Sequence, residues 1–118
     1  MTRTSPPLEI RVTDKGRTLV LTYEAEGEMA LSAEYLRVES PSAEVQGHTA
    51  KDKRIIAGKK DVTITGAHPV GNYAIKLTFS DGHDTGIYAW DTFVDMHRRY
   101  DEIWGAYLAN LATRGLNR

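Results

Sequence analysis

The chain has 118 residues, no cysteine, and 15 lysine and arginine side chains against 16 aspartate and glutamate side chains, so its formal net charge is −1. With 41% hydrophobic residues, a chain of this length is expected to form one ordinary globular domain. The charge balance argues against nucleic acid and anionic membranes as partners, because both attract clearly basic proteins. The absence of cysteine excludes disulfides, thiolate nucleophiles and cysteine-bound zinc or iron–sulfur clusters within the chain.

Residues 1–7 are polar and contain proline, and they lack the apolar stretch of a signal peptide. No other segment approaches the roughly 20 apolar residues that a membrane span requires. We therefore expect a cytoplasmic protein whose single domain covers residues 1–118.

Two segments near the N-terminus, residues 8–12 and 19–23, alternate apolar and polar side chains in the manner of half-buried strands. Between them, Gly16 can adopt a positive φ at no steric cost, as a short hairpin loop requires. This predicts two neighbouring antiparallel strands. The acidic residues that follow, 24–28, are predicted to form a loop.

A short helix is predicted over residues 33–37. Ser32 is a suitable N-cap, because its hydroxyl can accept a backbone N–H bond at the start of the helix. Pro41 lacks an N–H and disfavours helical backbone in the residue before it, so the helix must end early. Residues 40–60 show little periodicity and are predicted as a long loop with room for one short strand.

Three further strands are predicted in the second half of the chain. The first starts at Val62 and Ile64 and runs into Gly66, Pro69 and Gly71. Residues 73–79 carry apolar side chains at every second position, which is the clearest strand pattern in the sequence. The pair Asp81-Gly82 favours a tight turn, and residues 86–90 then return as the partner strand.

After residue 91 the period of the pattern changes. Apolar side chains recur at steps of three and four between Phe93 and Leu111, with Asp91 as the expected N-cap and Gly115 beyond the end. This predicts one amphipathic helix over about residues 92–113. The predicted fold is therefore α+β: a mainly antiparallel, twisted sheet of about five strands, with one short helix and the long C-terminal helix packed on one face.

The same helix carries three aromatic side chains whose role stays open: Tyr100, Trp104 and Tyr107. At helical spacing such rings most often belong to the core. A helix this aromatic can also cover a sheet and still present a ring to a partner, so the three residues are candidates for an interface.

Motifs of common enzyme families are absent from the sequence. None of the four histidines begins a His-x-Asp or His-x-Glu pair, which removes the local half of a 2-His-1-carboxylate iron site. HExxH, a P-loop, GxGxxG and GxSxG are missing too. The sequence therefore predicts no enzyme.

The turn over residues 81–86 brings Asp81, His83 and Asp84 close together in the chain. These side chains could bind a metal ion or act as a general base, and His48, in an irregular loop, could join them if the fold allows. Because aspartate and glycine are common turn formers, the structural interpretation is favoured, with His83 capping the hairpin. Weak zinc or iron binding is the alternative.

Three segments, residues 36–45, 69–74 and 80–90, resemble a known family in the same order along the chain. The family is called DUF971 and is also described as the γ-butyrobetaine hydroxylase-like N-terminal domain. The resemblance covers roughly residues 8–97, and three separate motifs in the right order make it specific.

The resemblance implies a metal site that this chain has lost. In the larger hydroxylases the small domain precedes a 2-oxoglutarate- and iron-dependent catalytic domain, helps in dimer contacts, and holds zinc with three cysteines and one histidine. The cysteine positions match Ser40, Ser42 and Val45, and the histidine matches His83. Valine has no donor atom and neutral serine hydroxyls are poor zinc ligands, so the hydroxylase-type zinc site is expected to be absent.

The resemblance also suggests a cellular context. Stand-alone bacterial members look like this chain, and the domain is also fused to Mrp-type P-loop ATPases that handle iron–sulfur clusters. The leading hypothesis is a non-catalytic accessory domain that binds a protein partner in metal or iron–sulfur metabolism. The alternatives are a zinc or iron site built on His83 and, third, a small acid/base enzyme; a homodimer is compatible with each.

Overall fold

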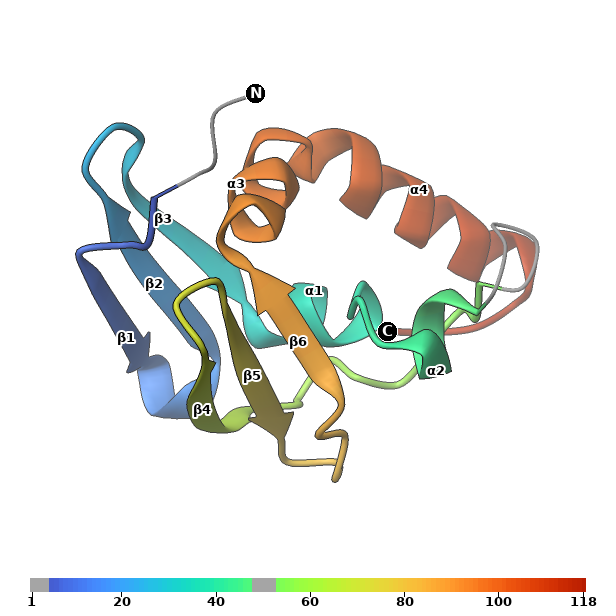
Figure 1. Ribbon diagram of the computed structural model, residues 1–118. Helices are drawn as coiled ribbons and strands as arrows, with labels where there is room; N and C mark the ends of the chain where they lie inside the picture. Colours follow the sequence, from blue (N-terminus) through green and yellow to red (C-terminus); the bar gives the residue numbers. More distant parts are fainter. Residues whose placement is uncertain (1–4, 48–52) are drawn as a thin grey trace.

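The computed structural model describes residues 5–47 and 53–118, which form an α+β fold with antiparallel sheets (Figure 1). The fold class and the antiparallel pairing confirm the prediction. The single sheet of about five strands is wrong, because the described strands form two sheets of three strands each. The first sheet contains β1 (Glu9–Thr13), β2 (Thr18–Tyr23) and β3 (Gly27–Ser32), and the second contains β4 (Ile64–Val70), β5 (Ala74–Phe79) and β6 (Gly86–Ala89).

The two predicted hairpins are present. β1 and β2 are joined by a short 3-10 turn, η1 (Asp14–Gly16), in which Gly16 has a φ of 89°. A Cβ atom at Gly16 would lie 2.8 Å from the Ile64 carbonyl oxygen, so glycine also allows this turn to approach β4. In the second sheet β5 and β6 are antiparallel, with Ile75 opposite Tyr88.

The main error in the first half of the chain concerns β3. Residues 24–28 were predicted as a loop, yet the strand already begins at Gly27 and pairs with β2. Met29 and Leu31 are its two buried side chains, and this alternation is too short to stand out in the sequence. Residues 27–32 therefore form a strand because they pair with β2, and their local hydrophobic pattern alone does not indicate it.

The short helix is confirmed as α1 (Ala33–Val38), and the Ser32 hydroxyl caps it by accepting the Tyr35 N–H at 3.0 Å. Residues 40–60 were predicted as a long loop with room for one short strand, and this prediction is wrong near the start of the segment, where the structure has a helix. One further turn of helix, α2 (Ala43–Gln46), begins after Ser42, whose hydroxyl accepts the Glu44 N–H at 3.2 Å. Both serines act as N-caps of the kind that shape short helices.

The prediction of a single C-terminal helix is also wrong. The structure has α3 (Trp90–Arg98) and α4 (Tyr100–Thr113), separated at Arg99, where φ is −100° and ψ is 20°. The N-cap of α3 is Ala89 rather than Asp91, which lies in the first helical turn. Figure 1 shows that the chain bends between the two helices.

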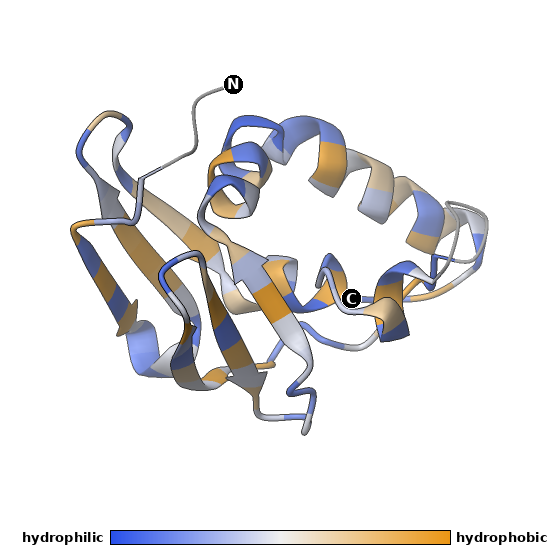
Figure 2. Cartoon of the chain, in the orientation of Figure 1, coloured by the Kyte–Doolittle hydropathy of each residue, from blue (hydrophilic) through white to orange (hydrophobic). Residues whose placement is uncertain are grey.

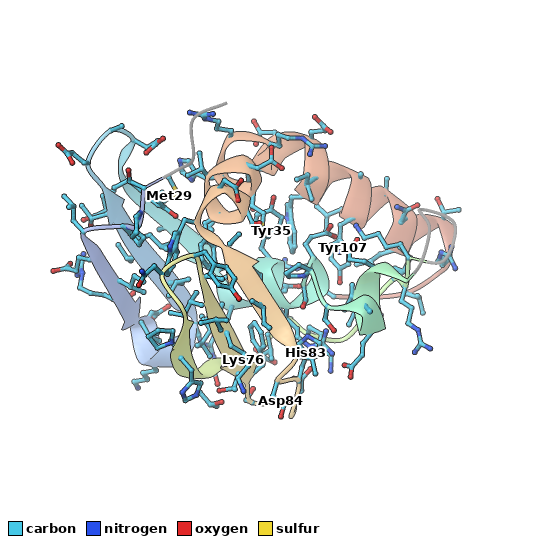
Figure 3. The ribbon with its side chains drawn as sticks, in the orientation of Figure 1. Met29, Tyr35, Lys76, His83, Asp84 and Tyr107 are labelled. Atoms are coloured by element: carbon cyan, nitrogen blue, oxygen red, sulfur yellow. The ribbon has the colours of Figure 1, made fainter. Side chains whose placement is uncertain are left out.

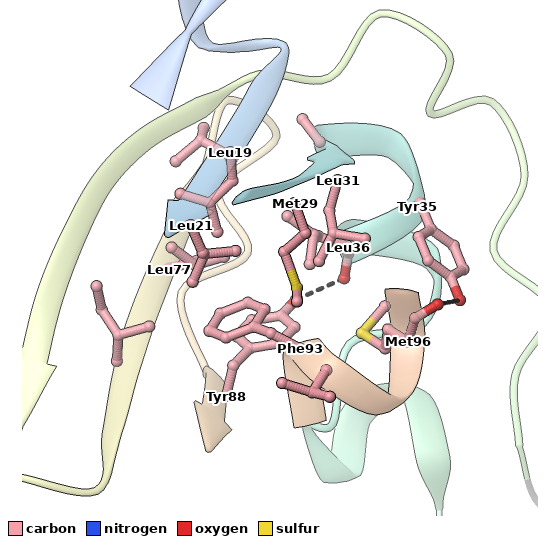
Figure 4. Close-up of a cluster of buried hydrophobic side chains, with 14 of the residues drawn as sticks. Leu19, Leu21, Met29, Leu31, Tyr35, Leu36, Leu77, Tyr88, Phe93 and Met96 are labelled. Carbon is pink, nitrogen blue, oxygen red and sulfur yellow. Dashed lines mark hydrogen bonds between the residues drawn. The ribbon is translucent and has the colours of Figure 1, made fainter. Parts of the chain in front are cut away.

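The main core lies between the two sheets and is covered by α1 and α3. In Figure 2 hydrophobic and hydrophilic residues alternate along the strands, and Figure 4 shows the inward-facing side chains. The largest fully buried residues include Tyr35, Tyr88, Phe93, Leu19 and Leu21. No helix in the described part of the chain is long and apolar enough to cross a membrane.

A second, smaller cluster lies beneath α4. It consists of Val38, Tyr107 and Leu111, with residues 55–57 and Trp104 packed against it. Thus α4 covers α1 and the segment after residue 54, whereas the predicted helix was expected to cover one face of the sheet.

Candidate functional site

The four positions that the family resemblance assigns to zinc ligands lie together. Ser40 and Ser42 follow α1, and Val45 belongs to α2. His83, which is labelled in Figure 3, lies in the turn between β5 and β6. The Ser40 Oγ lies 2.9 Å from His83 Nε2, and the Val45 N–H donates to the Ser42 carbonyl at 3.0 Å. All four residues are buried. A segment after the first helix and a turn some 40 residues later therefore meet in one place.

We call this group the Ser40–His83 cluster; it comprises Ser40, Ser42, His83 and Thr85. The Ser42 hydroxyl lies 2.7 Å from the Thr85 hydroxyl, and the Ser40 Oγ also accepts the Ser42 N–H at 3.2 Å. Its hydroxyl groups are thus paired with one another or with His83. This satisfies the polar atoms that the fold buries here.

The His83 ring is held on both sides. Its Nδ1 lies 3.3 Å from Glu44 Oε2, while its Nε2 faces Ser40 Oγ. We assign the proton to Nδ1, so that this nitrogen donates to Glu44 and Nε2 accepts the Ser40 hydroxyl. Burial lowers the pKa of His83 and the nearby Arg37 charge lowers it further, against the opposing effect of the Glu44 and Asp81 carboxylates. The neutral imidazole is therefore the form that this site favours.

Asp81 anchors the turn that carries His83. Its Oδ1 accepts the His83 N–H at 3.0 Å, and its Oδ2 accepts Arg37 Nε and Lys59 Nζ, each at 2.7 Å. Burial alone would raise the pKa of Asp81, but these hydrogen bonds and the Arg37 charge outweigh it and hold that pKa well below its ordinary value. Asp81 therefore acts as an ion-paired turn residue.

The other proposed metal ligands do not complete a site among the described residues. Asp84 is exposed, and His48 lies outside the described ranges. Within residues 5–47 and 53–118 no group of three or more histidine, aspartate or glutamate side chains is placed to hold a metal ion. The four positions that the resemblance assigns to zinc ligands do not fit that ion either, because they carry two neutral hydroxyls and a valine beside His83.

Several residues of the site were not predicted from the sequence. Arg37, Glu44 and Thr85 lie inside the motifs that carry the family resemblance, and Lys59 lies outside them. Their polar character beside the assigned ligand positions was the available signal. The sequence could not show which of these side chains contact one another, because each contact joins residues that are far apart in the chain or on different elements.

The order Ser40, His83, Glu44 resembles that of nucleophile, base and acid in serine hydrolases. Ser40, however, is 0% exposed. A Cβ atom at Gly86 would lie 2.8 Å from its hydroxyl oxygen, so the β6 backbone packs directly against it. A substrate carbonyl cannot come within bonding distance of a hydroxyl covered in this way, and the arrangement is structural in this conformation.

The candidate interface residues differ in accessibility. Tyr107 is 3% exposed, and its hydroxyl donates to the Ile56 carbonyl at 2.6 Å. Trp104 is partly buried, with its ring 5.9 Å from that of Tyr35 in an edge-on contact. Tyr100 is 41% exposed, so of the three it offers the most accessible ring.

A hollow at the other end of the second sheet was not predicted. Its volume is about 480 Å³, and it is lined by Ser5, Pro6, Asn72, Tyr73, Ala89, Trp90 and Asp91. The Trp90 Nε1 donates to the Asn72 carbonyl at 2.8 Å, which fixes its ring, whereas Tyr73 is 57% exposed. We call this feature the Tyr73 hollow. In the sequence, Tyr73 was part of the alternating strand pattern and of a segment that carries the family resemblance, and it was not a candidate site residue.

Fold and site together define a small α+β domain in which the segment after the first helix and a hairpin turn converge on a buried polar cluster. The chain belongs to the gamma-butyrobetaine hydroxylase-like, N-terminal family, whose model matches residues 10–94. Among curated proteins, none matches the chain. The family therefore covers both sheets, α1 and the beginning of α3, but not α4.

Solved structures agree with this assignment. Two proteins with NMR solution structures are 43% and 40% identical to the chain, with TM-scores of 0.83 and 0.82. The alignments cover 98% and 100% of this chain and 90% of each relative. A crystal structure of a DUF971 family protein of unknown function from Acidithiobacillus ferrooxidans is 35% identical, with a TM-score of 0.63, and covers 79% of this chain and 93% of that protein.

Proposed function

We propose that this protein is a non-catalytic accessory domain that binds a protein partner in metal or iron–sulfur metabolism. The observation that carries the proposal is the contrast between two regions. In the Ser40–His83 cluster, Ser40, Ser42 and His83 are buried and the hydroxyl groups are paired, while the Tyr73 hollow is open and lined by aromatic rings. The serine and histidine side chains of the cluster therefore stabilise the fold. The Tyr73 hollow is the surface that would bind the protein partner.

The Tyr73 hollow has the character of a protein-binding anchor site. Tyrosine and tryptophan are enriched at the energetic centres of protein interfaces, where they fill or line pockets. Trp90 is fixed by its hydrogen bond to Asn72, so its ring needs little further ordering on binding. Asp91 adds a carboxylate at the rim, which favours a basic group beside an apolar one in the partner.

The metabolic context rests on the family resemblance. Fusion of related domains to Mrp-type ATPases suggests a partner that assembles or carries iron–sulfur clusters. The domain would contribute recognition, since its own polar cluster lacks thiolates.

The experiment is affinity capture from lysate under anaerobic, reducing conditions, with wild type and Tyr73→Ala as baits. We expect a specific partner of the iron–sulfur or metal-handling class that Tyr73→Ala loses. Val12→Ala is the matched control, because Val12 is an exposed apolar side chain at 43% exposure on β1, outside the hollow. Equal capture by all three baits, or none by the wild type, would contradict the proposal.

One observation favours metal binding as a second candidate function. Of the four positions that the family resemblance assigns to zinc ligands, His83 is the one that keeps a metal-binding side chain. Calorimetric titration of wild type and His83→Ala with Zn²⁺ and Fe²⁺ separates the two candidates. Tight binding that disappears in His83→Ala supports the metal site, and weak binding by both proteins supports the accessory domain.

A further inference from the structure

The break between α3 and α4 has no local cause in the sequence. Residues 95–103 contain neither glycine nor proline, the usual causes of a sharp helix break. The Arg99 side chain contacts Asp95 at 3.2 Å and Glu102 at 2.5 Å, which are the one-turn pairs that stabilise a continuous helix. Even so, Arg99 has a ψ of 20°, far from the helical value near −42°.

Tyr35 of α1 supplies the cause. Its hydroxyl donates to the Met96 carbonyl at 2.8 Å, as Figure 4 shows. In an uninterrupted helix this carbonyl would accept the Tyr100 N–H. The Tyr35 ring also contacts the ring of Tyr100 edge-on at 5.1 Å. The break is therefore maintained by tertiary contacts to α1, and the local sequence favours a straight helix.

The segment beyond the break docks through contacts of its own. The Arg118 guanidinium binds the Glu34 carboxylate with two bonds, at 2.7 and 3.0 Å, and the Gly58 N–H donates to the Asn117 carbonyl at 3.0 Å. Tyr107 and Leu111 fill a cluster separate from the main core. Residues 100–118 thus form a docked unit, which is joined to the rest of the chain through Arg99.

We propose that residues 100–118 exchange between two copies of this chain, giving a reciprocal dimer in which α3 and α4 form one straight helix. Straightening carries α4 away from its own α1 and exposes the apolar face around Tyr107. The α1 surface of a second copy fits that face, because it is identical to the surface just vacated. Residues 103–118 of each copy then make with the other copy the contacts that they made within their own chain. The Met96 carbonyl exchanges the bond from Tyr35 for the helical bond from the Tyr100 N–H.

Such an exchange differs in kind from the proposed binding function. It uses α1 and α4, whereas the Tyr73 hollow is lined by residues 5–6, 72–73 and 89–91. The two can therefore succeed or fail separately. In the exchanged form, residues 100–118 of a second copy cover the α1 surface, because that surface is complementary in shape and charge to this segment.

The first test uses the Glu34–Arg118 ion pair. Glu34→Arg and Arg118→Glu each place like charges at the docking point, so each variant alone should dock α4 poorly. In an exchanged pair made of one copy of each, both docking points regain opposite charges. We therefore expect mixing of the two variants, followed by light scattering after size exclusion, to give a one-to-one dimer that neither variant forms alone.

The double variant Glu34→Arg/Arg118→Glu is the control, because it restores the pair within one chain and should behave like the wild type. A mixture that stays monomeric while the double variant folds would overturn the proposal. Assemblies larger than two would also overturn it, since reciprocal exchange closes at a dimer.

The second test removes the contact that holds the break and is independent of the Glu34 variant. Tyr35→Phe leaves the Met96 carbonyl without its donor in the bent form and keeps the ring. The substitution removes one ordinary hydrogen bond from the bent monomer, and two monomers are used for each dimer. The dimer association constant should therefore rise about thirtyfold. Tyr23→Phe is the matched control, because Tyr23 is buried and its hydroxyl donates to the Trp90 carbonyl at the same 2.8 Å. An unchanged association constant in Tyr35→Phe would overturn the proposal.

Discussion

Restoring the family's ligand chemistry should turn the Ser40–His83 cluster into a zinc site. The change is the triple substitution Ser40→Cys, Ser42→Cys and Val45→Cys, which adds three thiols beside the buried His83. The structure brings Ser40 to 2.9 Å from His83 Nε2 and Val45 into backbone contact with Ser42. With thiolates at these positions the donor set becomes that of a tetrahedral Cys₃His site.

The apo form of this variant should be less stable than the wild type. The Ser40–His83 and Ser42–Thr85 hydrogen bonds would be replaced by weak thiol contacts, at about 1 kcal/mol each. Val45→Cys removes roughly one methyl group from a buried position and costs about 1 kcal/mol more. The expected loss without metal is therefore about 3 kcal/mol.

Zinc should reverse this loss. Structural zinc sites bind with about 10 kcal/mol or more, which is a dissociation constant of about 50 nM or below. Zinc at about 50 μM therefore exceeds that constant by roughly a thousandfold or more and stabilises the folded state by about 4 kcal/mol. Urea unfolding with zinc, and again with a chelator, measures the difference; metal analysis after dialysis gives the stoichiometry. Adding His83→Ala to the triple variant is the control. Equal unfolding curves with zinc and chelator, or no zinc retained, would refute the assignment of these positions.

Three further outcomes are expected. Ser40→Ala leaves the His83 Nε2 and the Ser42 N–H without their partner in a buried place, so urea unfolding should show a loss of about 2–4 kcal/mol; a loss below about 0.5 kcal/mol would contradict the network. Because the folded pKa of His83 is lowered, the unfolded chain binds more protons just below pH 6.5, and this residue should make stability fall as pH drops through that value. His83→Asn should flatten that pH dependence in thermal melts, and an unchanged pH dependence in this variant would contradict the reasoning. Trp104→Ala should cost about 3 kcal/mol in chemical denaturation, at the lower end for a large aromatic residue because Trp104 is only partly buried, and a negligible cost would mean that α4 is not held through this ring.

Local patterns in the sequence were sufficient for the elements that local forces decide. The alternation over residues 73–79 gave β5, and the Ser32 cap gave α1. The division into two sheets could not be predicted, because strand periodicity does not say which strands pair. The helix break at Arg99 could not be predicted for a similar reason. It depends on the hydrogen bond from the Tyr35 hydroxyl to the Met96 carbonyl, and these two residues are 61 positions apart in the chain.

For the site, the sequence indicated which positions belong together, but it did not indicate which side chains contact them. The family resemblance pointed to Ser40, Ser42, Val45 and His83, which lie together in the structure. Nothing in the sequence showed that Ser40 is fully buried or that Glu44 lies beside the imidazole. Both facts arise when a turn near residue 83 packs on the segment after α1, and they decide what the site can do chemically.

The Ser40–His83 cluster and a zinc ion would serve the same mechanical purpose, which is to tie the segment after α1 to the turn between β5 and β6. Two hydrogen bonds of about 1 kcal/mol each are far weaker than a structural zinc site of about 10 kcal/mol or more. The remaining stability must therefore come from apolar burial and from contacts elsewhere on α1, where Tyr35 and Val38 pack beneath α4. The helix α4 begins beyond residue 94, where the family match ends, and it covers the same short helix that the polar cluster follows. The two features therefore act on the same element: the polar cluster fixes the segment at the C-terminal end of α1, and the contacts with α4 cover its side.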